Sequence, residues 1–329
     1  MAGIAPGHPD NFSTGLKETN LPNLKLLGRG KVRDKFQLPN GDLVIVTSDR
    51  ISVGDVVVGT VPGKGAVLNM VAGYWFEQTG DIMPNHVVSI PHPNVLVARE
   101  AVKVLPVEVV LRRYMAATMS ATSIYAAYTK GERTIYGVQF PEGLKGNQEL
   151  PMGTLITPTT KSEEHDEPLT ETQAAELVDQ ETGKGTWERV RSAALTLFDR
   201  ASTMLKRNGL LLVDTKIEFG LDRDGKLMVI DELFTPDSSR LWLADSYQER
   251  FEAGKGPENF DKEKVRSFLY EQMGWKPDQP VPRIPDELKA ATYEAYHVPY
   301  KMMTGKTLPP LPTSPEQIEN EISEAVAKL

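Results

Sequence analysis

Charged residues interrupt one of the most apolar stretches of this sequence. Residues 210–232 read LLLVDTKIEFGLDRDGKLMVIDE, a pattern typical of two β-strands around a turn. Alternation along the first strand places Asp214, Lys216 and Glu218 on one face and apolar side chains on the other. The second strand ends in two acidic residues. Side chains of these types, brought together on neighbouring strands, could bind a metal ion or an anion.

The apolar runs of this hairpin predict that it is covered on both sides, since residues 210–213 and 227–230 are continuously apolar. Charges enclosed in this way must be paired or must hold a metal or an anion. A solvated face on an edge hairpin is the alternative. Carboxylates on adjacent strands suit Mg²⁺, which usually takes one or two of them together with nucleotide phosphates. Glu218 is one candidate ligand, and the register decides whether Asp231 or Glu232 is the other.

A glycine-rich loop is a second candidate site. Residues 28–34 read GRGKVRD, in which the glycines let backbone amides approach an anion and a lysine adds positive charge. The motif is not GxGxxG, because Arg33 occupies the last glycine position. An ordinary hairpin turn is an equally simple interpretation. The strand–loop–strand setting favours a loop that lies over phosphates, as in kinases.

Other charged motifs are individually modest. SDRIS at residues 48–52 could be a capped turn, and TPTTKSEEHDE at residues 157–167 could be a solvated loop. LRRY places Arg112 and Arg113 on opposite faces of a strand, so only one can face a buried ligand. Arg240 in DSSRLW follows the charged hairpin closely enough to reach what its carboxylates hold.

Composition narrows the class of protein. The 329 residues are 40% hydrophobic and contain no cysteine, which excludes disulfides, thiolate metal sites and cysteine nucleophiles. The net charge of −8, without a long basic block, argues against a duplex-binding surface. The five histidines lack the spacing of a zinc site. No apolar run approaches the roughly 20 residues that span a bilayer, and we expect a soluble cytoplasmic protein without a membrane partner.

Periodicity predicts an α+β chain of two lobes. Residues 1–20 form an irregular lead-in, residues 21–106 a β-rich lobe with one helix, and residues 107–329 a larger lobe with C-terminal helices. We expect long ordered loops over residues 115–170. The predicted strands are 23–27, 32–38, 42–48, 86–90, 96–104, 107–114 and the hairpin; the predicted helices are 67–80, 186–209, 261–275, 285–305 and a terminal helix that ends at 329.

Taken together, the motifs resemble one family. GKVRDKF, SDRIS, PGKGAVLN, VEVVLRRY, TPTTKSEEHDE, VDTKIEFG, VIDELFTPDSSRLW and YEAYHVPYKMMTG occur in this order in phosphoribosylaminoimidazole-succinocarboxamide synthases, also called SAICAR synthetases. The resemblance extends from about residue 22 to residue 308 and is closest to the long monofunctional form.

The resemblance implies a two-lobed, SAICAR-synthase-like and ATP-grasp-like α+β fold with a kinase-like N-terminal lobe that binds ATP. It implies a ligase of purine biosynthesis that forms an amide bond between L-aspartate and carboxyaminoimidazole ribonucleotide, with ATP and Mg²⁺. An alternative is a kinase-like phosphotransferase with another small acceptor, although HRDxxxxN and DFG signatures are missing. A catalytically silent nucleotide-binding scaffold is a second alternative. No nucleic-acid partner is implied.

The family's functional residues can be carried over by their motifs. In the glycine-rich loop, Lys31 is the expected phosphate contact. The Mg²⁺ ligands match Glu218 and Asp231, which chooses between the two acids that periodicity left open. The remaining matches are Gly28, Gly30 and Arg33 in the ATP loop, Glu108 and Leu111 near adenine, and Arg112, Thr118, Lys161, Asp166, Lys216 and Arg240 at the substrates, with Lys216 and Arg240 also catalytic.

Two positions in this comparison are less regular. Thr118 stands where many members have serine, and Ala117 stands where many have glycine, so the hydroxyl is kept while the turn differs. His165 could serve as the base that takes the amine proton, or it could be structural.

Overall fold

The computed structural model describes residues 15–54, 56–161, 166–260, 263–309 and 314–329. The chain forms two compact units, each built from separate segments. The first combines residues 1–74, 87–100 and 260–329, and the second combines residues 75–86 and 101–259. Each unit contains a sheet with helices, which confirms the α+β class. The sequence-based division, in contrast, cuts the chain once after residue 106.

The first unit contains an antiparallel sheet of five strands in the order β1-β2-β3-β7-β6. The meander predicted for its first three strands is confirmed. The single strand predicted over residues 96–104 is wrong, because β7 ends at Ala98 and residues 103 and 104 pair with a strand of the other sheet. The strands of this first sheet are β1 (Lys25–Arg29), β2 (Arg33–Gln37), β3 (Leu43–Thr47), β6 (Val87–His92) and β7 (Val95–Ala98).

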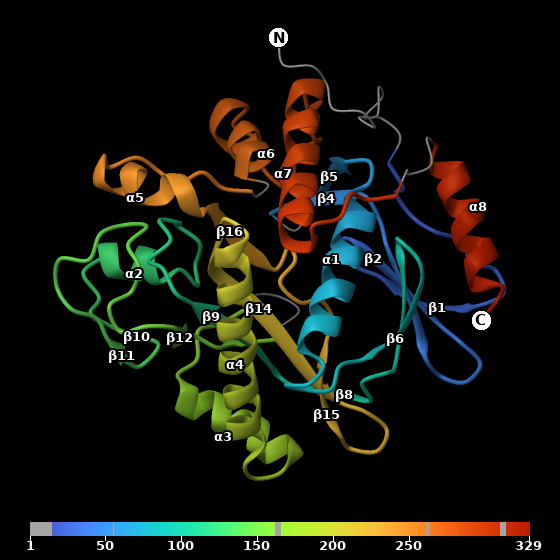
Figure 1. Cartoon of the computed structure of the whole chain (residues 1–329), viewed down its shortest axis with the longest axis horizontal. Helices are drawn as coiled ribbons and strands as arrows, with labels where there is room; N and C mark the ends of the chain where they lie inside the picture. Colours follow the sequence, from blue (N-terminus) through green and yellow to red (C-terminus); the bar gives the residue numbers. More distant parts are fainter. Residues whose placement is uncertain (1–14, 55, 162–165, 261–262, 310–313) are drawn as a thin grey trace. The chain divides into compact units, whose positions relative to one another are not determined.

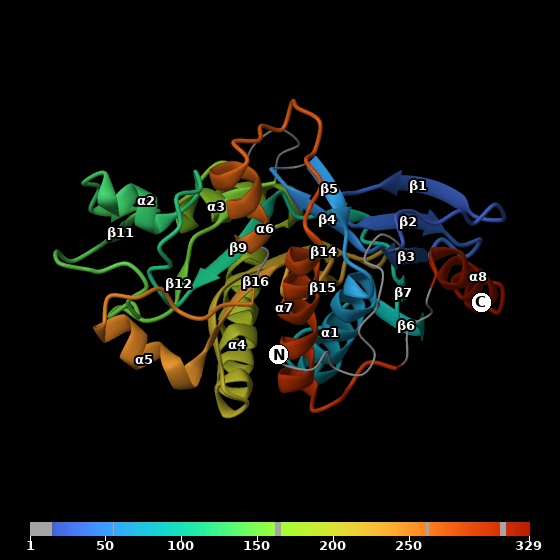
Figure 2. The ribbon, with the colours of Figure 1, turned by 90° about the horizontal axis from the view of Figure 1, so that it is seen from above.

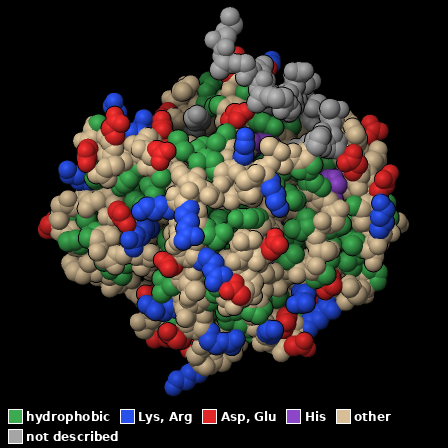
Figure 3. Space-filling view, in the orientation of Figure 1, with side chains coloured by type: hydrophobic (Ala, Val, Ile, Leu, Met, Phe, Trp, Pro, Cys, Tyr) green, Lys and Arg blue, Asp and Glu red, His purple; other side chains and the backbone are tan. Residues whose placement is uncertain are grey.

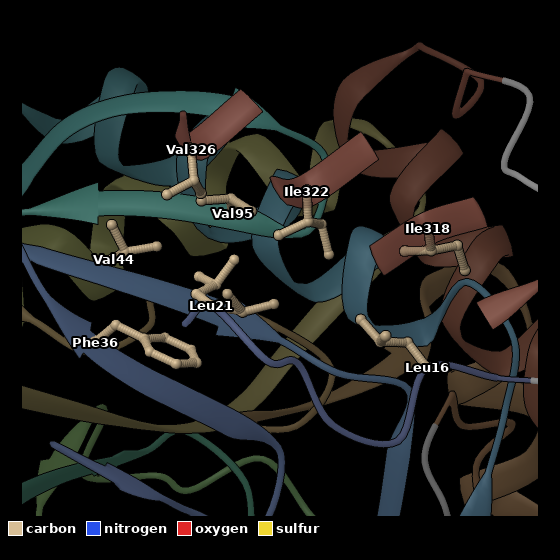
Figure 4. Packing of buried hydrophobic residues seen from close by; sticks show 9 residues of the cluster. Leu16, Leu21, Phe36, Val44, Val95, Ile318, Ile322 and Val326 are labelled. Atoms are coloured by element: carbon tan, nitrogen blue, oxygen red, sulfur yellow. The ribbon is translucent and has the colours of Figure 1, made fainter. Parts of the chain in front are cut away.

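The C-terminal helix covers part of this sheet. Helix α8 (Pro315–Val326) begins at Ser314, whose hydroxyl accepts a hydrogen bond from the Gln317 N–H. Its apolar residues recur every four positions and lie on one face. Figure 4 shows this face against the β-sheet, and Figure 2 shows the helix beside β6. The buried cluster consists of Leu16, Leu21, Phe36, Val44, Val46, Val95, Ile318, Ile322 and Val326.

The remaining elements of the first unit are helix α1, a hairpin and three further helical segments of the described residues. Helix α1 (Lys64–Thr79) begins three residues earlier than predicted and continues into the second unit. The others are β4 (Arg50–Val53), β5 (Val56–Thr60), α6 (Glu263–Ser267), the π-helix η1 (Phe268–Gln272) and α7 (Asp286–Thr304).

The charged hairpin lies at the centre of the second unit. Strand β14 (Leu210–Leu221) pairs antiparallel with β8, β9, β15 and β16. Residues 210–213 and 227–230 are all buried, so both faces of the hairpin are covered there as predicted, and the alternative of a solvated edge hairpin is wrong. Helix α4 (Thr186–Arg207) lies against β14, as Figure 1 shows. The partner strands are β8 (Lys103–Val104), β9 (Val107–Arg112), β15 (Leu227–Ile230) and β16 (Ser239–Leu243).

Several short elements of the second unit were not predicted. Helix α3 (Glu171–Thr182) has a capping box between Thr170 and Gln173, a signal that the sequence contains. The others are α2 (Ile124–Thr129), α5 (Ala244–Glu252), β10 (Thr134–Ile135), β11 (Val138–Gln139), β12 (Leu155–Ile156) and β13 (Thr159–Thr160).

The surface mixes charges of both signs. Figure 3 shows acidic and basic side chains interspersed on the face that it draws. Among the described residues, no helix has the length and apolar character needed to cross a membrane.

Two glycines differ sharply in the space around them. A Cβ at Gly65 would lie 2.2 Å from the Thr47 carbonyl oxygen, whereas one at Gly28 would meet nothing within 4 Å. We expect Gly65→Ala to lower the free energy of unfolding by at least about 2 kcal/mol, because backbone must move. We expect Gly28→Ala to change it by less than about 1 kcal/mol. Urea unfolding followed by circular dichroism measures both, and equal losses would contradict the packing described.

Candidate functional site

Three strands of the second unit present charged side chains on one side of the sheet. Along β14, Asp214, Lys216 and Glu218 alternate with the buried Thr215 and Ile217. The register sets Asp214 opposite Arg112 of β9 and opposite Arg240 of β16. Glu108 and Arg112 occupy alternate positions of β9 and share a face. Because both edges of β14 are paired, the sheet fixes the order in which these charges follow one another.

Lys216 is surrounded by carboxylates. Its ammonium donates to Glu108 Oε1 at 3.0 Å and also to Glu218. Burial alone would lower the pKa of Lys216, but the negative charges of Glu218, Asp231 and Glu108 outweigh it, so the pKa is raised above its ordinary value. Lys216 therefore stays protonated at neutral pH and acts as a fixed positive charge.

The pKa of Glu108 is changed by the same group of charges. Burial raises the pKa of Glu108, the Lys216 ammonium opposes that change, and the charges of Glu218 and Asp166 add to it. The carboxylates thus repel one another, and a cation among them relieves the repulsion. Such a group of carboxylates can bind a metal cation in place of an ammonium group.

Asp231 belongs to this cluster. Asp231 lies one residue beyond the end of β15 and has a φ of 66°, a conformation that aspartate tolerates better than most residues. The turn of the backbone at Asp231 ends the alternation of the strand. The negative charge of Asp231 raises the pKa of Lys216. Glu232 instead accepts a hydrogen bond from the buried Thr235 hydroxyl.

Asp214 lies between two arginines. Arg240 donates to Asp214 Oδ2, and Arg112 NH1 lies 3.8 Å from the same oxygen. The side chains of Asp214 and Arg112 are only 13% and 11% exposed. One carboxylate therefore holds two guanidinium groups close together, a pair that could receive a carboxylate or phosphate of a ligand.

Further residues orient Arg112. Its Nε donates to the buried Thr157 hydroxyl at 2.8 Å, and its NH2 donates to the Thr122 carbonyl at 3.1 Å. Thr118 begins the turn that leads to Thr122, and the Thr118 carbonyl accepts from Ser123 Oγ at 2.7 Å. The structure thus connects the Thr118 turn to Arg112. The sequence reasoning gave no role to Thr157 or Asp214, although both stand inside motifs that it singled out.

The charged loop after β13 contributes one more cation. Lys161 donates to Glu218, so that this carboxylate is shared between two ammonium groups. Asp166 is exposed and acts on Glu108 through its charge. His165, the possible base, lies outside the described residues.

Leu111 is not part of this charged face. It is fully buried on the other side of β9, opposite Ile156 of β12 and Thr215 of β14. Alternation turns the Leu111 side chain into the core, and the place of Leu111 near adenine stays a prediction.

The glycine-rich loop belongs to the first unit. It joins β1 to β2, and the Gly30 N–H donates to the Arg33 carbonyl at 2.7 Å, which closes a tight turn. Arg33 begins β2 and is partly buried, and Lys31 is exposed. The strand–loop–strand arrangement predicted from the sequence is confirmed.

The donor set around Lys216 fits a hard cation. The described residues contain no group of three or more His, Cys, Asp or Glu side chains arranged to hold a metal. Mg²⁺ needs only one or two protein carboxylates when phosphates and water complete its shell. Glu218 and Asp231, both acting on one ammonium, meet that requirement.

Comparisons with known proteins identify one family. The family model described as SAICAR synthetase matches residues 26–282. A phosphoribosylaminoimidazole-succinocarboxamide synthase of Legionella pneumophila is 43% identical over 295 residues, which is 89% of this chain and 91% of that protein. The chloroplastic synthase of Arabidopsis thaliana is 39% identical over 328 residues, 97% of this chain and 78% of that protein. The SAICAR synthase of Saccharomyces cerevisiae, solved with SAICAR, superposes with a TM-score of 0.75 at 29% identity and covers 89% of this chain and 99% of that one.

The position of Asp214 between two guanidinium groups makes its charge structurally important. We expect Asp214→Asn to lower the free energy of unfolding by at least about 2 kcal/mol, because two partly buried arginines lose their counter-charge. Asp81→Asn is the matched control, since Asp81 pairs with Arg200 but its side chain is 68% exposed, and we expect little change. Urea unfolding measures both, and a similar response of the two variants would refute this role of Asp214.

Proposed function

This chain belongs to the SAICAR synthetase family, and on that premise we propose that it ligates L-aspartate to carboxyaminoimidazole ribonucleotide. ATP is consumed, and the products are SAICAR, ADP and phosphate. The enzyme is then a C–N ligase of purine biosynthesis. The observation that carries the proposal for this chain is the charged face of β9, β14 and β16, where Lys216 and two arginines stand among buried carboxylates.

All three reactants are anions, and this explains the pattern of charge. Arg112 and Arg240 are proposed to bind the carboxylate or phosphate of the ribonucleotide, with Thr118 at its edge. Asp214 keeps both guanidinium groups oriented toward the same place. Lys216 supplies a permanent positive charge beside them, and Lys161 and Asp166 border the substrates.

We assign the ATP phosphates to the loop that contains Gly28, Gly30, Lys31 and Arg33. Loops of this kind bind phosphate through backbone amides and a neighbouring cation. In the second unit, Glu108 remains the proposed residue near adenine. Each assignment rests on a motif match and on the geometry of its own unit.

Mg²⁺ is proposed to bind Glu218 and Asp231. Bound there, the ion would neutralise phosphate charge. Lys216 and Lys161, which pair with Glu218 in the structure described, could then turn toward substrate oxygens. The protein residues would thus exchange partners while the total charge of the site stays balanced.

The chemistry requires an activated carboxyl group. The carboxylate oxygen of the ribonucleotide attacks the γ-phosphorus of ATP, the bond to ADP breaks, and an acyl phosphate forms. The amine of aspartate then attacks the acyl carbon, phosphate leaves with the electron pair of the C–O bond, and the amine loses a proton. We assign Lys216 to stabilising the negative charge that develops in these steps, since its ammonium lies on the charged face.

An omission assay tests the reaction. We expect ADP release only when ATP, carboxyaminoimidazole ribonucleotide and L-aspartate are all present, with one SAICAR formed per ADP, because the acyl phosphate must be made and consumed on the enzyme. Coupled detection of ADP and chromatography of SAICAR measure both products. ADP release that is independent of the ribonucleotide and of aspartate would reject the proposal.

Single substitutions test the assigned residues. We expect Glu218→Gln and Asp231→Asn each to reduce kcat by about 100-fold or more. Each variant loses a proposed Mg²⁺ ligand, and the ion is what offsets the negative charge at the reacting phosphate. We expect Arg240→Ala to raise the KM for the ribonucleotide about tenfold or more, the effect of losing a charge-assisted hydrogen bond.

Two variants serve as controls for these substitutions. Asp222→Asn changes a carboxylate that accepts hydrogen bonds in the β14–β15 turn, and Arg200→Ala removes a partly exposed arginine that pairs with Asp81, away from the charged face. Circular dichroism checks the fold of every variant. Normal kinetics in Glu218→Gln, Asp231→Asn and Arg240→Ala would remove the basis of the assignment.

A further inference from the structure

Three consecutive carbonyl groups of the glycine-rich loop are held by the SDRIS motif. Arg50 donates from NH2 to the Gly30 carbonyl and from Nε to the Lys31 carbonyl, each at 3.0 Å. The next carbonyl, that of Val32, accepts from the backbone N–H and from the hydroxyl of Ser48, each at 2.8 Å. The loop is therefore fixed through its backbone, by residues that follow the next strand of the sheet.

These hydrogen bonds determine where the amides of the loop point. A peptide unit is planar, and in the trans form its C=O and N–H point in opposite directions. The described residues contain no cis peptide. Since the carbonyls of Gly30 and Lys31 point toward Arg50, the N–H groups of Lys31 and Val32 point away from it. Successive N–H groups on one side of a turn form an anion-binding concavity.

Arg50 is itself held firmly. Its side chain is only 9% exposed, and NH2 lies 2.8 Å from Asp34 Oδ1, a carboxylate that is fully buried. Its NH1 donates to the Lys17 carbonyl, and Asp34 Oδ2 accepts from the Thr19 N–H at 2.9 Å. The guanidinium thus bonds three carbonyls and one carboxylate through a planar fork of fixed geometry, which a lysine cannot reproduce.

The loop has free space beside both of its glycines. A Cβ at Gly28 would meet nothing within 4 Å, and one at Gly30 would meet only the Arg33 carbonyl oxygen, at 3.4 Å. Packing in the described structure therefore does not require glycine at either position. Close approach of a group such as phosphate to the backbone does require it.

We propose that Arg50 is a positioning residue for ATP: by holding the carbonyls of Gly30 and Lys31, it directs the Lys31 and Val32 amides toward the phosphates. The inference rests on the proposed function, in which this loop receives the phosphates of ATP. Arg50 does not contact the nucleotide. It acts through the backbone, and Asp34 acts through Arg50.

The test compares nucleotides with and without phosphates. In Arg50→Lys we expect the affinity for ATP, measured by calorimetry, to fall at least tenfold, while the affinity for adenosine changes less than twofold. In steady-state assays the KM for ATP rises, and the KM for the ribonucleotide does not. Arg50→Gln, which loses the charge as well, shows the same selectivity with a larger fall.

Arg133→Lys is the matched control. Arg133 also bonds two backbone carbonyls, those of Tyr128 and Glu132, and a carboxylate, that of Glu142. These partners belong neither to the glycine-rich loop nor to the charged face of β9, β14 and β16, so replacing Arg133 leaves ATP affinity unchanged. Equal losses of ATP and adenosine affinity in Arg50→Lys would indicate general loosening and overturn the proposal, as would unchanged ATP affinity.

A measurement on the wild-type protein applies even where both Arg50 variants fail to fold. Amide hydrogen exchange at Lys31 and Val32 slows on addition of ATP and not on addition of adenosine. If ATP does not slow this exchange more than adenosine does, the proposal is overturned. The omission assay separates this inference from the proposed function. Wild-type protein that makes no SAICAR but shows the ATP-selective protection would reject the function and leave the role of Arg50 intact.

Discussion

The balance of charge around Lys216 is the interaction on which the second unit depends. Removing one unit charge from water costs several kcal/mol even after relaxation, and here one ammonium and several carboxylates share a partly covered face. Each charge is tolerated because its neighbours offset it, as the raised pKa of Lys216 shows. Such a cluster contributes little net stability. The cluster is better explained as a group of charges, held in fixed positions, that can bind a ligand.

The sheet makes this clustering possible. Strand β14 has partner strands along both edges, and from residue 214 to residue 218 its side chains alternate between a charged face and a core face. Cross-strand neighbours then follow from the register alone, and Asp214 faces both arginines. Asp231 is the exception, because it leaves the strand with a positive φ. A turned residue at a strand end can aim its carboxylate where alternation would forbid it.

Sequence patterns predicted this arrangement only in part. Alternation was sufficient to place Lys216 and Glu218 on one face, because they are two residues apart on a strand. It was insufficient for Asp231, whose direction depends on one backbone angle, and the family resemblance supplied that choice. Alternation alone also places the Leu111 side chain in the core, on the face of β9 opposite Glu108 and Arg112. Thr157 was missed because a threonine that orients an arginine has no pattern of its own.

The two units hold their functional groups in place in opposite ways. In the second, backbone pairing holds side chains in place, and the side chains carry the charge. In the first, the buried side chain of Arg50 holds the backbone in place, and the amides become the functional groups. A loop without ladder hydrogen bonds would sample many conformations at a cost of about 1–2 kcal/mol per residue when ordered. Fixing Gly30, Lys31 and Val32 before the ligand arrives removes that cost from binding, which is why the wholly buried Asp34 carboxylate matters: it holds Arg50, and Arg50 holds the loop.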